Sequence, residues 1–167
     1  MIPKIDHLGI PVENIDYNRP LFDYFDLEIG TIEYVPEFGV EIAFIRVGES
    51  LIELVEPVDR NSDVAADLEA TAQTASLHHV AYRVDDIATR LVELRTRRVP
   101  LADEEPRQGA GEGRVAFLDR RAANGIRIEL VERDTDVTLE QVFSGKIGYA
   151  YFNETHTIST HHNHRFG

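Results

Sequence analysis

Short stretches in which hydrophobic and polar residues alternate recur along the chain, separated by glycine, proline and polar clusters. Alternation with a period of two is typical of half-buried β-strands. In the first half it predicts strands over residues 2–12, 31–35, 40–47 and 50–56. A short helix is expected after the first strand, because Asn14 or Asp16 can cap it and Pro20 is tolerated only in a first turn. The predicted order in the first half is therefore β-α-β-β-β.

The second half has the same order of elements. Asp85 or Asp86 can cap a helix whose apolar side chains recur every three or four residues, as on one helix face. Strands are predicted near residues 99–102, 114–119 and 126–131. A short helix beginning near Ser62 is expected between the halves. The glycine-rich segment 106–113 runs into a strand rather than a helix, so it lacks the context of a phosphate-binding loop.

The two halves also share sequence words. Residues 5–15 (IDHLGIPVENI) align with residues 77–87 (LHHVAYRVDDI), and residues 51–56 (LIELVE) align with residues 127–132 (RIELVE). Self-similarity of this kind indicates one structural unit used twice. We therefore predict an α+β fold that contains two tandem βαβββ modules.

The polar residues that recur in these words are good metal ligands within otherwise apolar strands. His7 and Glu53 lie in the first copy, and His79 and Glu129 lie at the corresponding places in the second. Taken singly, a histidine could be a core imidazole and a glutamate could face solvent, as strand alternation often demands. Their repetition favours a shared role instead. Imidazole and carboxylate ligands suit one divalent ion such as Co, Zn, Ni, Mn or Fe(II), and four of them would leave two octahedral positions open.

Composition and charge narrow the function classes. The chain has no cysteine, which excludes disulfides, thiolate metal sites and thiol nucleophiles. The formal charge of −13 argues against nucleic acid as a partner, because phosphates would be repelled. No apolar run approaches about 20 residues, so no membrane span is expected. The chain enters a strand pattern at once, without a signal peptide, which favours a cytoplasmic location.

On these residues the chain resembles the vicinal oxygen chelate superfamily of glyoxalases, bleomycin resistance proteins and dioxygenases. Within it the resemblance is greatest to the methylmalonyl-CoA epimerases, and it covers about residues 2–132. Its most specific words are HHVAYRVDDI at residues 78–87 and EPRQGAG at residues 105–111. The resemblance implies an open, metal-containing barrel of the glyoxalase type and a divalent-metal-dependent isomerase.

The resemblance also implies roles for individual residues. Glu41 stands where the epimerases have a candidate general base, Glu129 is the second candidate, and His78 is expected to support its neighbour rather than bind metal. The implied metal ligands are His7, Glu53, His79 and Glu129. The implied reaction is 1,1-proton transfer through an enolate of a 2-substituted malonyl-CoA thioester. An acyl-CoA or similar small-molecule substrate and a homodimer are expected, with neither nucleic acid nor membrane as partner.

Two other functions stay open. A glyoxalase I-like lyase would use the same four ligands, whereas a small-molecule-binding module of the bleomycin resistance type would not need them. Retention of all four ligands counts against the module. The predicted division of the chain is a first module at residues 1–57, a connector at 58–76, a second module at 77–133 and a partly disordered extension at 134–167.

Overall fold

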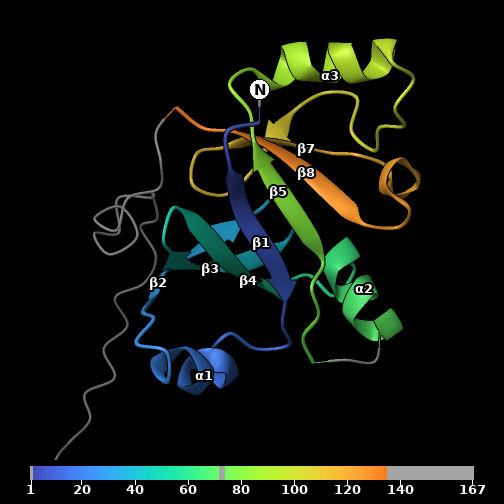
Figure 1. The fold of residues 1–167 in the computed structure, drawn as a ribbon. Coiled ribbons are helices and arrows are strands. Elements are labelled where there is room, and N and C mark those ends of the chain that lie inside the picture. Colours follow the sequence, from blue (N-terminus) through green and yellow to red (C-terminus); the bar gives the residue numbers. More distant parts are fainter. Residues whose placement is uncertain (1, 72–73, 135–167) are drawn as a thin grey trace, which may run out of the picture.

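A computed structural model describes residues 2–71 and 74–134 of the chain (Figure 1). Within these residues the strands form one curved, eight-stranded sheet in the order β2-β3-β4-β1-β5-β8-β7-β6. The strands are β1 (Ile5–Pro11), β2 (Ile29–Val35), β3 (Val40–Val47), β4 (Ser50–Pro57), β5 (His79–Arg83), β6 (Arg107–Gln108), β7 (Arg114–Phe117) and β8 (Arg127–Glu132). The helical segments are η1 (Asp16–Asn18), α1 (Arg19–Asp23), α2 (Asp63–Thr71), α3 (Ile87–Thr96) and η2 (Arg120–Ala123). This α+β arrangement of two βαβββ halves confirms the predicted fold class.

The two halves meet in the middle of the sheet, where β1 runs antiparallel to β5 (Figure 1). In each half the inner strand pairs in parallel with the last strand of that half, β1 with β4 and β5 with β8. The other strands add outward in antiparallel fashion. Gly9 of β1 is the Cα partner of both Glu53 on β4 and His79 on β5. The register therefore brings predicted ligands from both halves to one level of the sheet.

The two faces of the sheet carry separate sets of apolar side chains. Ile42 and Phe44 of β3 belong to the cluster on the face that holds the predicted ligands. Ala43, which lies between them, packs on the opposite face with Phe22 of α1. In the second half, α3 lies at the other end of the molecule from α1 and buries Leu91 against the sheet (Figure 1). Both helices thus leave the ligand-bearing face uncovered.

One polar contact recurs at the first helical segment of each half. Glu56 Oε2 accepts a hydrogen bond from the backbone N–H of Ile15 at 2.8 Å. Glu132 Oε2 accepts one from the backbone N–H of Ile87 at 2.6 Å. Glu56 and Glu132 lie three residues after the predicted ligands Glu53 and Glu129. Strand alternation therefore directs them to the opposite face of the sheet, on which α1 and α3 pack and which we call the helix-bearing face. In each half, the second glutamate of the repeated sequence thus contacts a helical segment, whereas the first lies on the opposite face of the sheet.

Two details differ from the sequence predictions. The strand predicted near residues 99–102 is not formed, because Pro100 has no N–H for a ladder and Leu101 makes only an isolated bridge to Leu118. The short edge strand is β6, inside the glycine-rich segment. The predicted extension lies outside the described residues except for Asp134, and the predicted module boundaries stay predictions. None of the described helices is long and apolar enough to cross a membrane.

Candidate metal centre

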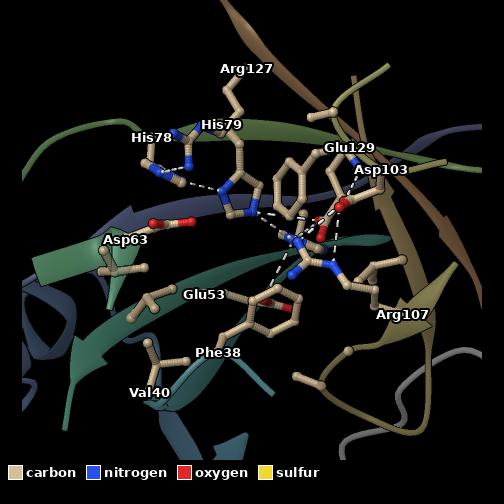
Figure 2. A pocket seen from close by; sticks show the side chains of 18 of the residues that line it. Phe38, Val40, Glu53, Asp63, His78, His79, Asp103, Arg107, Arg127 and Glu129 are labelled. Atoms are coloured by element: carbon tan, nitrogen blue, oxygen red, sulfur yellow. Dashed lines mark hydrogen bonds and ion pairs between the residues drawn. The ribbon is translucent and has the colours of Figure 1, made fainter. Parts of the chain in front are cut away.

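Three of the four predicted ligands converge on one buried point near the middle of the sheet. Nε2 of His7 lies 3.1 Å from Nε2 of His79 and 2.9 Å from Oε2 of Glu129. Nε2 of His79 lies 3.5 Å from the same glutamate oxygen. One donor atom from each of these residues lies within 4.8 Å of the other two. Figure 2 shows His79, Glu129 and Glu53 directed into one pocket from different strands.

Asp6 holds the imidazole of His7 from behind. Its Oδ1 lies 3.0 Å from Nδ1 of His7, and its Oδ2 accepts a hydrogen bond from Nε of Arg83 at 2.6 Å. Burial would raise the pKa of Asp6, but His7, Arg133 and Arg83 together hold that pKa well below its ordinary value. An ionised carboxylate beside Nδ1 favours the proton on that nitrogen. The lone pair of Nε2 is then directed at the centre.

A second chain of contacts supports His79. Nδ1 of His79 lies 2.8 Å from Nδ1 of His78, whose Nε2 lies 2.8 Å from Oδ2 of Asp67 on α2. Arg120 and Arg127 pair with the same aspartate at 3.0 and 2.9 Å. A supporting partner at Nδ1 fixes the orientation of the ring and leaves Nε2 for the centre. His78 thus contacts His79 from behind, as expected of a supporting residue.

The pKa values of the two central imidazoles shift in opposite directions. Burial alone would lower the pKa of His7, but the carboxylates of Glu53 and Glu129 raise it to about 10. Burial and the neighbouring cationic groups lower the pKa of His79 well below its ordinary value. Two Nε2 lone pairs at 3.1 Å repel each other unless a proton or another cation lies between them. The centre is therefore arranged to hold positive charge.

The donor set fits a divalent cation. Within residues 2–71 and 74–134, Oε2 of Glu129 is a buried oxygen without a hydrogen bond of good geometry, although it lies 2.9 Å from Nε2 of His7. Buried polar atoms are nearly always satisfied, so this oxygen requires an explanation. Two imidazole nitrogens and a carboxylate oxygen are ligands that Co, Zn, Ni, Mn and Fe(II) accept. His7, His79 and Glu129 could hold such an ion together.

Glu53, the fourth predicted ligand, reaches the same centre from β4. Its Oε2 lies 3.4 Å from Nε2 of His7, and burial raises its pKa. Its Oε1 lies 3.4 Å from Nη2 of Arg133, a buried side chain that the sequence analysis did not identify. Arg133 follows Glu129 by four residues, so strand alternation places both on one face. That spacing is the signal that could have identified it.

A cavity of about 530 Å³ opens from the centre and has walls from both halves of the sheet. Most of the lining is apolar, including Phe38, Val40, Ile42, Val55, Val115 and Phe117. Arg107, Arg120 and Arg127 also line it, and the guanidinium of Arg107 lies 4.5 Å from the centre of the Phe38 ring. A cavity of this size, with apolar walls and polar side chains directed into it, is typical of a small-molecule site. Figure 2 shows Arg107 and Arg127 on different sides of it.

The structure does not bring Glu41 to this cavity. Val40 and Ile42, its neighbours on β3, both line the cavity, and successive strand side chains point to opposite faces. Glu41 therefore lies on the helix-bearing face, opposite Glu56 in the pairing of β3 with β4. Its placement contradicts the predicted role as the base, because a residue on the far face cannot reach a substrate in the cavity.

A single curved sheet of paired βαβββ halves, with buried histidine and glutamate side chains at its centre, defines a glyoxalase-like α+β protein. The chain belongs to the Glyoxalase/Bleomycin resistance protein/Dioxygenase superfamily, whose family model matches residues 6–117. The predicted resemblance to this superfamily is thereby confirmed.

Several relatives share most of the chain. The uncharacterized protein YqjC of Bacillus subtilis is 35% identical over 134 residues, which cover 80% of this chain and 94% of that protein. The ethylmalonyl-CoA/methylmalonyl-CoA epimerase of Cereibacter sphaeroides is 31% identical over 134 residues, covering 78% of this chain and 98% of the relative. A solved structure of a Streptomyces coelicolor methylmalonyl-CoA epimerase variant with 2-nitronate-propionyl-CoA is similar, with a TM-score of 0.75 and 25% identity. The structural similarity covers 81% of this chain and 100% of the epimerase chain.

Proposed function

We propose that this protein is a divalent-metal-dependent isomerase of the methylmalonyl-CoA epimerase type. Its reaction would invert the α-carbon of a 2-substituted malonyl-CoA thioester by 1,1-proton transfer. The observation that carries the proposal is the buried set of His7, His79 and Glu129 at the end of an apolar cavity. The similarity to epimerases from Cereibacter sphaeroides and Streptomyces coelicolor supports the same reaction class.

His7, His79 and Glu129 are the residues that would hold the ion, with Glu53 beside them. When bound, a divalent ion supplies Lewis-acid stabilisation of the negative charge that an enolate carries. The apolar walls of the cavity would shield a bound substrate from water in part, and a lower local dielectric strengthens electrostatic interactions. Asp6 and His78 keep the two imidazoles oriented.

The arginines of the cavity wall offer sites for an anionic substrate. Arg107, Arg120 and Arg127 line the cavity together with Asp63, Asp103 and Asp119. Asp67 holds Arg120 and Arg127 on one side, and Asp103 lies 3.2 Å from Nε of Arg107 on another. Guanidinium groups bind phosphate and carboxylate oxygens through paired hydrogen bonds. We assign these side chains to the anionic groups of an acyl-CoA.

Of the two predicted proton-transfer residues, Glu41 and Glu129, Glu129 lines the cavity and Glu41 does not. We assign Glu129 removal of the α-proton, as a ligand that would share its carboxylate between the ion and the proton or dissociate from the ion. The electron pair of the broken C–H bond is then delocalised onto the thioester and carboxylate oxygens. A proton returned to the opposite face of the α-carbon restores the C–H bond and gives the other epimer. Glu53 reaches the cavity from the other half of the sheet, and burial raises its pKa, which favours the protonated carboxylic acid. In that form it is positioned to give its proton to the α-carbon and become a carboxylate. We further propose that the protein forms a homodimer and that it is located in the cytoplasm.

The test is exchange of the α-proton of methylmalonyl-CoA for deuterium, followed by mass spectrometry. We expect exchange by protein loaded with Co(II) and its loss in the presence of a chelator. Glu129→Gln should slow exchange by at least about 100-fold, because positioned proton-transfer groups contribute about 10²–10⁴-fold. Absence of exchange by loaded wild-type protein would remove the proposal. Turnover of a hemithioacetal alone would identify a lyase, and tight binding of an apolar ligand without metal would identify a binding module.

A further inference from the structure

Asp67 lies on α2, the short helix that connects the two halves of the sheet. Ser62 caps this helix, because its Oγ accepts a hydrogen bond from the backbone N–H of Ala65 at 3.2 Å. Val64, on the same helix, packs against the apolar cluster of the first half and lines the cavity. The helix therefore holds Asp67 beside the cavity that contains the candidate metal centre.

The carboxylate of Asp67 reaches that centre through two imidazoles. Its Oδ2 lies 2.8 Å from Nε2 of His78, and Nδ1 of His78 lies 2.8 Å from Nδ1 of His79. Only 8% of either imidazole side chain is exposed, so the relay is largely shielded from water. In the first half Asp6 lies directly behind His7, at its Nδ1. The second half thus replaces a direct carboxylate contact with a relay through one histidine.

Nε2 of His78 has two neighbours with opposite requirements. Asp67 offers it a carboxylate oxygen, which accepts a hydrogen bond, whereas Nη1 of Arg127 contacts the same nitrogen as a donor. One imidazole nitrogen can donate to Asp67 or accept from Arg127, but it cannot do both. Figure 2 shows His78 joined to His79, with Arg127 beside them. Asp67 and Arg127 therefore compete for the proton position of His78.

The proton position of His78 decides which nitrogen of His79 carries a proton. Burial and Arg127 lower the pKa of His78 to about 4, so its ring is neutral near pH 7. When its Nε2–H donates to Asp67, its Nδ1 accepts from Nδ1–H of His79, and Nε2 of His79 has a lone pair for a cation. When its Nε2 accepts from Arg127, its Nδ1–H donates to His79, whose own proton then blocks Nε2.

We propose that Asp67 is a positioning residue that acts through His78 and keeps the Nε2 lone pair of His79 directed at the cation. The inference rests on the metal site of the proposed function and deepens it, because it adds α2 to the elements that support that site. Arg120 and Arg127 pair with Asp67 at 3.0 and 2.9 Å and favour its ionised form. An ionised carboxylate is the stronger acceptor for Nε2–H of His78.

The test is isothermal titration calorimetry of the chelator-treated protein with Co(II). Asp67→Ala should weaken Co(II) binding by about 10–100-fold, which is the usual cost of removing a partner behind a histidine ligand. Asp67→Asn keeps an oxygen that can accept from Nε2–H of His78, so its loss should be clearly smaller. Glu69→Gln removes one negative charge from the exposed side of the same helix and is the matched control, with the affinity of the wild type.

A double-mutant cycle separates positioning from an effect of charge or of helix stability. His78→Phe interrupts the relay, so adding Asp67→Ala to it should not weaken Co(II) binding further. An effect of long-range charge or of helix stability would persist in both backgrounds. Full additivity of the two substitutions, or wild-type affinity in Asp67→Ala, would overturn the inference and leave the metal site intact.

Circular dichroism establishes that each variant is folded. If His78→Phe does not fold, the series of wild type, Asp67→Asn and Asp67→Ala decides the matter. A loss in Asp67→Asn as large as that in Asp67→Ala would then overturn the inference, because the charge and not the hydrogen bond would carry the effect. Absence of Co(II) binding by the wild type would overturn the inference together with the metal part of the proposed function.

Discussion

A Cβ atom on Gly9 would lie 1.9 Å from Cε1 and 2.3 Å from Nε2 of His79. The two residues are partners across the junction of β1 and β5, where the halves of the sheet meet. The imidazole of His79 therefore occupies the space that any other residue at position 9 would need for its side chain. A glycine is required here for room at the candidate metal centre.

Replacing Gly9 with alanine should displace the His79 imidazole. A real Cβ atom does not approach another atom at 1.9 Å, and both strands are central to the sheet, so the ring must move. We expect the affinity for Co(II) to fall by at least about 100-fold, since changes outside the ligand shell alone cost about 10–100-fold. Isothermal titration calorimetry of the chelator-treated protein measures this affinity.

Gly48→Ala provides the matched control in the turn between β3 and β4. Nothing lies within 4 Å of the added Cβ, but the residue has a φ of +61°, which strains an alanine. The cost is roughly 1–2 kcal/mol of stability. Gly48→Ala should therefore unfold more easily and still bind Co(II) like the wild type. Equal affinities in Gly9→Ala and wild type would show that His79 is not a ligand.

The duplication made the central site predictable from sequence. His7, Glu53, His79 and Glu129 were identified because each has a counterpart at the same place in the other half. The same comparison of the two halves did not identify Arg133. This residue follows the repeated sequence, and the first half has Pro57 at the corresponding position. A buried residue with no counterpart leaves no trace in a self-alignment.

The role of base was predicted for Glu41 for a different reason. Residues 42–45 of β3 are buried on both faces of the sheet, so the hydrophobic pattern there has no period of two. Without alternation, the sequence does not indicate which side chains of the strand face the cavity and which face the helices. The resemblance to the epimerases then determined the choice, and an offset of one residue along a strand exchanges the faces.

Glu41→Gln should therefore leave catalysis nearly unchanged. Its side chain lies on the helix-bearing face, and substitutions away from a site usually alter free energies by no more than about 0.5 kcal/mol. Deuterium exchange at the α-carbon should stay within about twofold of the wild type, which is that free energy expressed as a rate ratio. A loss as large as that of Glu129→Gln would restore Glu41 as the base.

Metal binding should stabilise the folded protein. An ion that binds only the folded state at 100 times its dissociation constant adds about 2.7 kcal/mol to the free energy of unfolding. For a chain of this size that corresponds to an increase in Tm of about 5–10 °C. Differential scanning calorimetry with Co(II) or Zn(II) measures the increase, and His79→Ala should abolish it. Mg(II) should have little effect, since it prefers oxygen ligands.

The stability of the metal-free protein should depend on pH through His7. The folded pKa of about 10 exceeds the ordinary value of 6.5, so the folded state retains a proton that the unfolded chain releases. This contribution to stability is fully present below pH 6.5 and is lost as the pH rises through 10. The urea midpoint of chelator-treated protein should fall over that window. A midpoint with the same pH dependence in His7→Gln would contradict the assignment.

The paired contacts of Glu56 and Glu132 predict equal structural roles in the two halves. Either glutamate, replaced by alanine, would leave a buried backbone N–H at the start of a helical segment without its acceptor, that of Ile15 or Ile87. An unsatisfied buried donor costs about 1–3 kcal/mol, so both variants should lose stability of this order in urea unfolding.

Glu132 also pairs with Arg114, so that ion pair must be measured separately. Arg114→Met removes the ion pair and retains the acceptor for Ile87, and it should cost clearly less than Glu132→Ala. Hydrogen exchange separates the two effects further. The amide of Ile87 should lose protection in Glu132→Ala and keep it in Arg114→Met. Equal losses of stability in the two variants, with the Ile87 amide still protected, would show that the glutamate acts through its ion pair and that the repeated helix contact contributes little.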